Sequence, residues 1–122
     1  MNPAQETRPL VAVVCKVPLV GEAAGSAIDF AEVKFFGGGR DTAGLLSWLR
    51  PDAVVVDSEE DAEAAAAFAV EHELSAVHIG VRDRTLRVLR RSGWEVVGNG
   101  EGPTPEAIRN AVAGSLFSRE EP

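Results

Sequence analysis

Apolar residues occur along the chain in short runs that alternate with segments of helical spacing. Three of the runs are almost unbroken, as in strands whose two faces are both covered. These runs are residues 10–15, 53–56 and 76–81. Residues 30–36 (FAEVKFF) differ, because Glu32 and Lys34 interrupt the apolar positions at a period of two. This alternation predicts a strand with one wet face, near an edge of a sheet. A short fifth strand is expected at residues 94–97.

Four helices are predicted, at residues 18–28, 41–50, 58–73 and 104–117. Asp41 is a suitable cap for the second helix, and Ser58 with Asp61 resembles a capping box for the third. Thr104 followed by Pro105 is a strong signal for the start of the fourth helix.

The faces of two helices indicate how they pack. Gly21 and Gly25 weaken the first helix by propensity, but they would let it lie close against a sheet. The second helix carries an apolar stripe that predicts burial. The stripe consists of Leu45, Leu46, Trp48 and Leu49, and Trp94 is likewise expected to fill core or interface space.

The segment 83–97 is ambiguous. Residues 83–92 fit a short helix that Asp83 caps and Gly93 closes. The same segment fits a hairpin that pairs residues 86–89 with residues 94–97. The spacing of Leu86 and Leu89 favours the helix by a narrow margin.

Strands that alternate with helices are typical of an α/β protein with helices on both faces of a parallel sheet. The 122 residues fit one domain. We expect a flexible N-terminus at residues 1–8, a doubly wound α/β domain at residues 9–117 and a flexible acidic tail at residues 118–122.

Composition narrows the function further. A formal net charge of −7 argues against general binding of nucleic acids. The chain has no run of about 18 apolar residues and no signal-peptide pattern at its start, so we expect a cytoplasmic protein without a membrane span. A single cysteine, Cys15, and two histidines make a disulfide impossible and a structural zinc site improbable.

Charged residues are clustered by sign. Acidic residues crowd positions 52–63, and arginines crowd positions 82–91. The two clusters are either solvated faces or a docking surface for a protein partner or a second copy of the chain. The candidate docking residues are Arg84, Arg87, Arg90 and Arg91.

The stretch 30–58, and above all LRPDAVVVD at residues 49–57, resembles the receiver domains of bacterial response regulators. The resemblance covers roughly residues 10–117 and is weaker after Asp57. It implies a three-layer, flavodoxin-like fold with a mostly parallel five-stranded sheet in the order 2-1-3-4-5. It also implies a role in signal transduction.

Five positions carry the chemistry of that family, and only the phosphoacceptor, Asp57, is retained here. Cys15 and Lys16 replace the acidic pair that binds Mg²⁺ with it. Gly80 stands at the Ser or Thr position, and Gly98 or Asn99 at the Lys position. Phosphoryl transfer to a carboxylate needs a divalent ion, and Mg²⁺ is usually held by more than one anionic group. Because Asp57 alone supplies one carboxylate, we expect no metal and no cofactor. Lys16 is expected to lie beside Asp57, in place of the charge of the metal. Asp57 is then expected to have a structural role, either as a cap or in a pair with Lys16.

The sequence therefore favours a non-catalytic pseudo-receiver, a protein-interaction module that acts without phosphorylation. One alternative is a phosphorelay receiver that is phosphorylated on Asp57. Another is a phosphotransfer or phosphatase enzyme with Cys15 as nucleophile, since that position resembles the nucleophile of sugar-phosphotransferase B domains and small tyrosine phosphatases. However, the loop after Cys15 lacks the arginine of such phosphatases. The glycines of residues 37–40 lack the spacing of a phosphate-binding loop and are expected to form a flexible turn.

Overall fold

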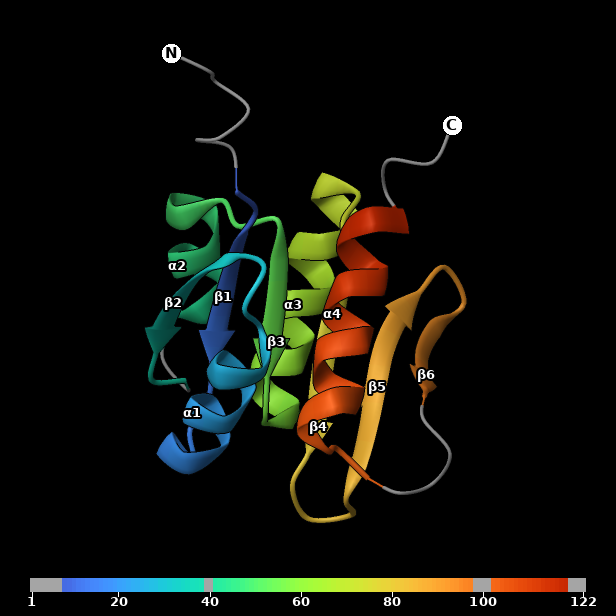
Figure 1. Ribbon diagram of the computed structural model, residues 1–122. Coiled ribbons are helices and arrows are strands. Elements are labelled where there is room, and N and C mark those ends of the chain that lie inside the picture. The colour runs from blue at the N-terminus through green and yellow to red at the C-terminus, as the bar shows by residue number, and fades with distance from the viewer. Residues whose placement is uncertain (1–7, 39–40, 98–101, 119–122) are drawn as a thin grey trace.

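The computed structural model describes residues 8–38, 41–97 and 102–118 of the chain. Within these ranges six strands form one sheet, and four helices cover it (Figure 1). The strands are β1 (Leu10–Val14), β2 (Glu32–Phe36), β3 (Ala53–Val56), β4 (Ala76–Gly80), β5 (Thr85–Arg90) and β6 (Gly93–Val96). The helices are α1 (Pro18–Ala27), α2 (Thr42–Leu49), α3 (Glu59–His72) and α4 (Pro105–Ser118).

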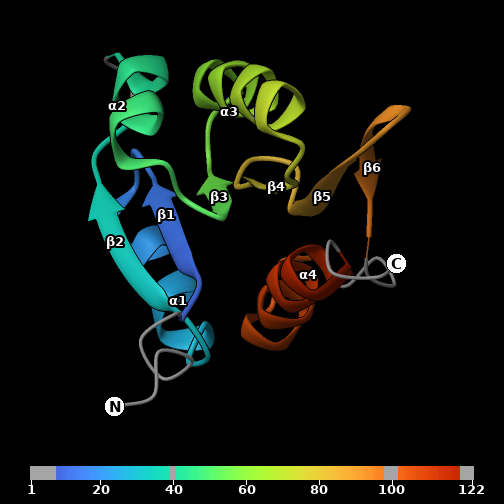
Figure 2. The same cartoon turned by 90° about the horizontal axis from the view of Figure 1, so that it is seen from above.

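The sheet has the order β2-β1-β3-β4-β5-β6. The first four strands are parallel, whereas β5 and β6 run antiparallel to their neighbours. Helices α1 and α4 lie on one face and α2 and α3 on the other, which gives three layers (Figure 2). The expected α/β architecture is therefore present. The expected five-stranded, mostly parallel sheet is wrong in its strand count and in the direction of its last strands.

The difference arises at residues 83–97, which form a β-hairpin and not the favoured helix. Leu86 and Val88 are 1% and 4% exposed, while the residues between and after them are only partly buried. This alternation is typical of a strand with one face on a core. The turn is completed by Gly93, whose φ of 117° lies in a region that side chains rarely adopt.

Two apolar cores lie on the two faces of the sheet. Successive residues of a strand point to opposite faces, so Val11 and Val13 pack under α1 and α4, and Ala12 and Val14 pack under α2 and α3. Each of these four side chains is at most 1% exposed. The cores hold β1 in the centre of the parallel strands and fix the loop that follows it.

The helix-start signals are confirmed. Asp41 accepts a hydrogen bond from Gly44 N–H, and Ser58 accepts one from Asp61 N–H. The close approach of α1 is present at Gly25, where a Cβ atom would collide with the ring of Phe35. The expected burial of the α2 stripe is wrong at Trp48, which is 77% exposed. Successive residues of a helix are rotated by about 100°, so Trp48 points about 200° away from Leu46. Because Leu46 faces the core, Trp48 faces solvent.

Several expectations lie outside the described residues. They are the flexible start, apart from Arg8, most of the acidic tail, and the family's Lys position at Gly98 or Asn99. Arg8 donates to the backbone oxygen of Ala31 at 3.2 Å. Within the part of the chain that is described, no helix has the length and apolarity needed to cross a membrane.

Candidate functional site

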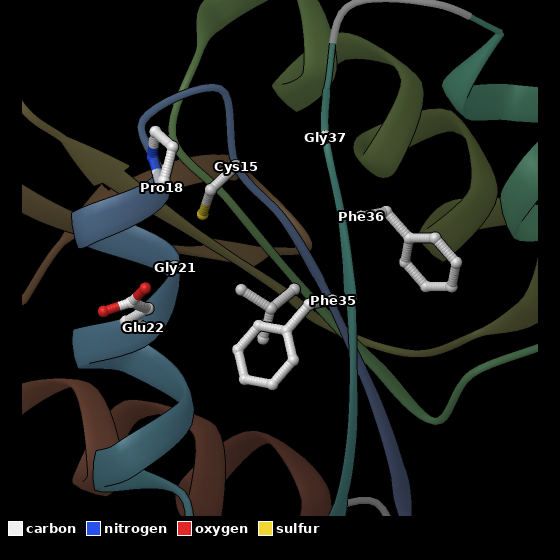
Figure 3. Close-up of a pocket in the computed structure, with 8 residues that line it drawn as sticks. Cys15, Pro18, Gly21, Glu22, Phe35, Phe36 and Gly37 are labelled. Carbon is white, nitrogen blue, oxygen red and sulfur yellow. The ribbon is translucent and has the colours of Figure 1, made fainter.

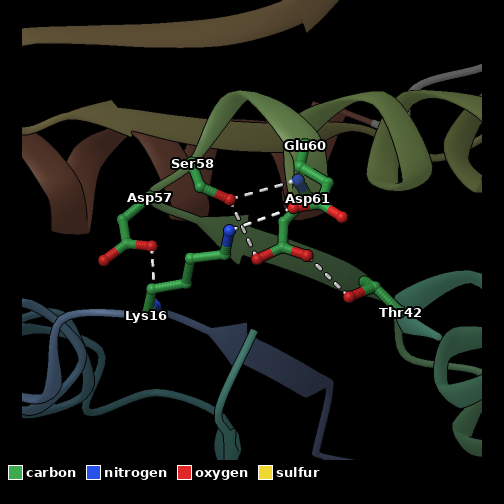
Figure 4. A network of polar contacts seen from close by, with 6 residues as sticks. All are labelled: Lys16, Thr42, Asp57, Ser58, Glu60 and Asp61. Atoms are coloured by element: carbon green, nitrogen blue, oxygen red, sulfur yellow. Dashed lines mark hydrogen bonds and ion pairs between the residues drawn. The ribbon is translucent and has the colours of Figure 1, made fainter. Parts of the chain in front are cut away.

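The carboxyl ends of the four parallel strands lie at the same end of the sheet. The chain leaves β1 toward β2 on one side and leaves β3 toward β4 on the other. In doubly wound proteins, ligands bind at such a reversal of strand order. Six polar side chains gather there, and we name them the switch-point cluster (Figure 4). The cluster consists of Lys16, Thr42, Asp57, Ser58, Glu60 and Asp61.

Asp57 follows β3 and bonds to the loop that follows β1. Its Oδ1 accepts from the backbone N–H of Lys16 at 2.8 Å, and its Oδ2 accepts from the backbone N–H of Val17 at 2.9 Å. The residue is only 9% exposed. Hydrogen bonds between N–H groups and an ionised carboxylate are about twice as strong as neutral ones. Asp57 therefore fastens two neighbouring strands together through both of its oxygens.

The need for this carboxylate arises at the start of α1. The first N–H groups of a helix have no partner within the helix. Val17 is the capping residue of α1, and an apolar side chain cannot accept a hydrogen bond. Pro18, the first helical residue, has no N–H group. Asp57 accepts instead from the N–H of this capping residue and of the residue before it, and its negative charge lies at the favourable end of the helix dipole.

The expectation that the Lys16 side chain pairs with Asp57 is wrong. The Lys16 ammonium lies 3.0 Å from Glu60 Oε1, in the first turn of α3, and only the backbone of Lys16 contacts Asp57. The hydrogen bond to Glu60 and its charge raise the pKa of Lys16. Because the two side chains are 43% and 66% exposed, this pair is screened by water and contributes little to stability.

Asp61 is the residue of the cluster that the sequence did not single out as a buried group. It is 1% exposed, and its carboxylate accepts from Thr42 Oγ1 at 2.6 Å and from Ser58 Oγ at 3.0 Å. It joins the first turn of α3 to the first turn of α2. A Cβ atom on Gly38 would collide with this carboxylate, so the chain after β2 passes directly against Asp61. The capping pattern at Ser58 was the only sequence signal for this arrangement.

Cys15 lies at the end of β1 but has the wrong electrostatics for a nucleophile. The residue is 6% exposed. Burial, followed by the charges of Asp57 and Asp61, raises the pKa of its thiol to about 12. A reactive cysteine needs the opposite environment, one that stabilises the thiolate. At neutral pH this thiol is protonated.

A cavity of about 420 Å³ opens beside Cys15, between α1 and the ends of β1 and β2 (Figure 3). Its described lining is mainly apolar and includes Phe35, Phe36 and Pro18, with Glu22 as the one charged side chain among those residues. Within residues 8–38, 41–97 and 102–118, neither an arginine nor Lys16 lines it. The cavity is therefore poorly suited to a phosphate group.

The end of β4 is close to two polar side chains of the connection to β5. A Cβ atom on Gly80 would collide with Asp83 Oδ1 and would lie 2.5 Å from Thr85 Oγ1. A Ser or Thr at this position would therefore require these two side chains to move. Among the described residues, no group of three or more His, Cys, Asp and Glu side chains is arranged to hold a metal ion.

The hairpin separates the four candidate docking arginines. Arg84 precedes β5 and Arg91 follows it, so the two lie at opposite ends of that strand. Arg87 pairs with Asp83 at 3.1 Å, and Arg90 pairs with Glu95 at 2.9 Å. The expected basic cluster is thus divided, and half of its members have acidic partners within the hairpin region.

No family model, no curated protein and no solved structure matches this chain. The class of protein is therefore defined by its own geometry. It is a three-layer α/β domain. At the point where its strand order reverses, the Asp57 carboxylate bonds to the backbone of residues 16 and 17.

Proposed function

We propose that the protein is a pseudo-receiver, a non-catalytic module that acts in signalling or regulation by binding another protein. In this proposal it works in the cytoplasm, without phosphorylation and without a cofactor. The single observation that carries the proposal is the bonding of both Asp57 oxygens to the backbone of residues 16 and 17.

Phosphorylation of Asp57 would undo this bonding. An acyl phosphate forms when one carboxylate oxygen attacks phosphorus, and that oxygen then carries the phosphoryl group. One of the two N–H groups, of Lys16 or Val17, would lose its charged acceptor at a site where the carboxylate is 9% exposed. Both N–H groups belong to exposed residues and the two hydrogen bonds are only partly buried, so the loss is a fraction of the cost of about 1–3 kcal/mol for a fully buried N–H group.

Electrostatics around Asp57 add to this cost. The first turn of α3 contains three carboxylates, on Glu59, Glu60 and Asp61. The Lys16 ammonium, which interacts with the charge of Asp57, is already paired with Glu60. An incoming phosphoryl group would meet negative charge without a metal to neutralise it.

The proposed docking surface is the hairpin of β5 and β6 together with Arg84, which directly precedes it. Arg84 and Arg91 are exposed, and Val96 is 56% exposed on the edge strand β6. An edge strand with exposed arginines in the neighbouring turns fits an acidic partner segment. The internal ion pairs of Arg87 and Arg90 reduce the basic charge that this surface offers.

Incubation with acetyl phosphate and Mg²⁺, followed by intact-mass measurement, tests the proposal. We expect no gain in mass, and the same result for Asp57→Asn. A gain of one phosphoryl group that Asp57→Asn abolishes would establish a phosphorelay receiver instead. A phosphoryl group that is lost in Cys15→Ala but kept in Asp57→Asn would identify the cysteine enzyme.

A further inference from the structure

Strand β2 forms an open edge of the sheet. It pairs with β1 on one side, and no other described strand pairs with its outer side. The side chains of Glu32 and Lys34 are more than half exposed, and Phe35 is 57% exposed. An exposed edge strand is a template for pairing with another chain.

The hydrogen bonds to β1 determine which backbone groups of β2 face outward. Glu32 N–H donates to Pro9, and the Phe36 carbonyl accepts from Cys15. In a strand, successive residues direct their N–H and C=O groups to opposite sides. Residues 32, 34 and 36 therefore bond toward β1, whereas Val33 and Phe35 direct their backbone groups away from the sheet.

The outward groups restrict how two copies of β2 can pair about a two-fold axis. In an antiparallel pair, residues with outward groups on both strands must lie opposite each other. Axes centred on Val33 and on Phe35 both satisfy this condition, but only the axis on Val33 places Glu32 opposite Lys34 of the second copy, twice. Centring it on residue 34 would place Lys34 opposite Lys34, and centring it on residue 32 would place Glu32 opposite Glu32. Opposite charges directly across a strand pair are stabilising, and like charges are destabilising.

We propose that the protein self-associates through β2, with a second copy pairing antiparallel about Val33. The two six-stranded sheets then join into one continuous sheet, in which Phe35 lies opposite Ala31 of the second copy. The occupant of this edge is a second copy because the edge is self-complementary. Glu32 and Lys34 are equidistant from Val33, so a two-fold axis at Val33 exchanges them.

In the single chain Glu32 and Lys34 already form a pair at 3.4 Å along the strand. In the dimer these four side chains form a set of alternating charges, with each ammonium next to two carboxylates. The pair directly across occupies a non-hydrogen-bonded position, where side chains are closest. A strand of five residues contributes a small interface, so we expect weak association that is detectable only at high protein concentration.

Sedimentation velocity at rising protein concentration, up to about 1 mM, tests this proposal on the full chain. Lys34→Glu places two carboxylates opposite each other, and Glu32→Lys places two ammonium groups opposite each other. We expect each single variant to weaken association roughly tenfold or more. The double exchange Glu32→Lys with Lys34→Glu restores the opposite charges and is expected to restore association.

Two controls separate this interface from other causes. Arg82→Glu changes the net charge by the same amount as Lys34→Glu, but it lies in the exposed turn between β4 and β5, outside the four candidate docking residues, and we expect it to associate like the parent. Circular dichroism of every variant reports whether the fold is kept. A parent that stays monomeric up to the highest concentration would overturn the proposal. It would also be overturned by a dimer that survives Lys34→Glu, or by a double exchange that stays as weak as the single variants.

Discussion

Replacement of Asp57 by Asn gives the sharpest prediction, because two accounts of Asp57 predict opposite signs. In a working phosphorylation site, several carboxylates share one pocket, and removal of one charge relieves repulsion and stabilises the fold. In this protein Asp57 is an acceptor for two backbone N–H groups, at 2.8 and 2.9 Å. We therefore expect Asp57→Asn to destabilise the fold.

The size of the effect follows from the two hydrogen bonds. An Asn side chain has one acceptor oxygen, so one N–H group keeps a neutral partner and the other faces an NH₂ group. A hydrogen bond to a charged group contributes about 1.5–3 kcal/mol. Loss of one such bond and weakening of the other give an expected loss of about 2–4 kcal/mol in the free energy of unfolding.

Urea denaturation of the parent and of Asp57→Asn measures this difference through the midpoint at unchanged slope. Glu60→Gln is the matched control, because it removes a carboxylate from the same cluster but only from the exposed pair with Lys16. We expect its midpoint to stay close to that of the parent. An Asp57→Asn protein as stable as the parent, or more stable, would refute the argument that Asp57 caps the loop.

Three further predictions concern single positions. Gly38→Ala should lower the free energy of unfolding by about 1–3 kcal/mol, because the added Cβ meets the buried Asp61 carboxylate; Gly37→Ala, with no neighbour within 4 Å, should leave it nearly unchanged, and equal urea midpoints would contradict the contact. The pKa of Cys15 rises from 9.0 to about 12 on folding, so the folded state holds the thiol proton more tightly than the unfolded state, and the stability of the fold should fall between pH 9 and pH 12. In thermal melts, the stability of Cys15→Ala should fall less steeply over this range. Parallel curves for the parent and the variant would argue against a buried neutral thiol. Gly93→Ala should cost about 1–3 kcal/mol because of its φ of 117°, and a neutral effect in urea denaturation would argue against the hairpin turn.

Strands and helix starts were predictable because their signals are local. The apolar run at residues 53–56 coincides with β3, and Asp41 and Ser58 cap the helices that they precede. A continuous apolar run indicates a strand covered on both faces, whatever covers it. A cap needs only its own side chain and an amide three residues later.

The helix was narrowly favoured over the hairpin at residues 83–97 because two periods overlap in this sequence. Leu86 and Leu89 are three residues apart, which suggested a helix face. The burial follows Leu86 and Val88, two residues apart and almost fully covered. Strand β5 has a neighbour on each side, β4 and β6, and the sequence does not display that pairing. Tertiary pairing decided between two local patterns of similar strength.

The candidate site was predictable in its residues but not in its contacts. The sequence placed Asp57 and Lys16 at the ends of adjacent strands, and the structure brings them together. It suggested a contact between two charged side chains, whereas the contact joins a carboxylate to backbone N–H groups. Sequence patterns describe side chains and leave backbone donors unmarked. The burial of Asp61 was not predicted for a related reason. It depends on tertiary contacts with the Thr42 hydroxyl and with the backbone at Gly38, which the sequence does not display.

The central claim is that the Asp57 carboxylate is already occupied by the N–H groups of Lys16 and Val17. Amide NMR signals of these two residues, recorded during addition of Mg²⁺ and beryllofluoride, test it most directly. The account predicts that both signals keep their positions and their slow exchange with solvent throughout the titration. Saturable shifts of both signals, absent in Asp57→Asn, would contradict it.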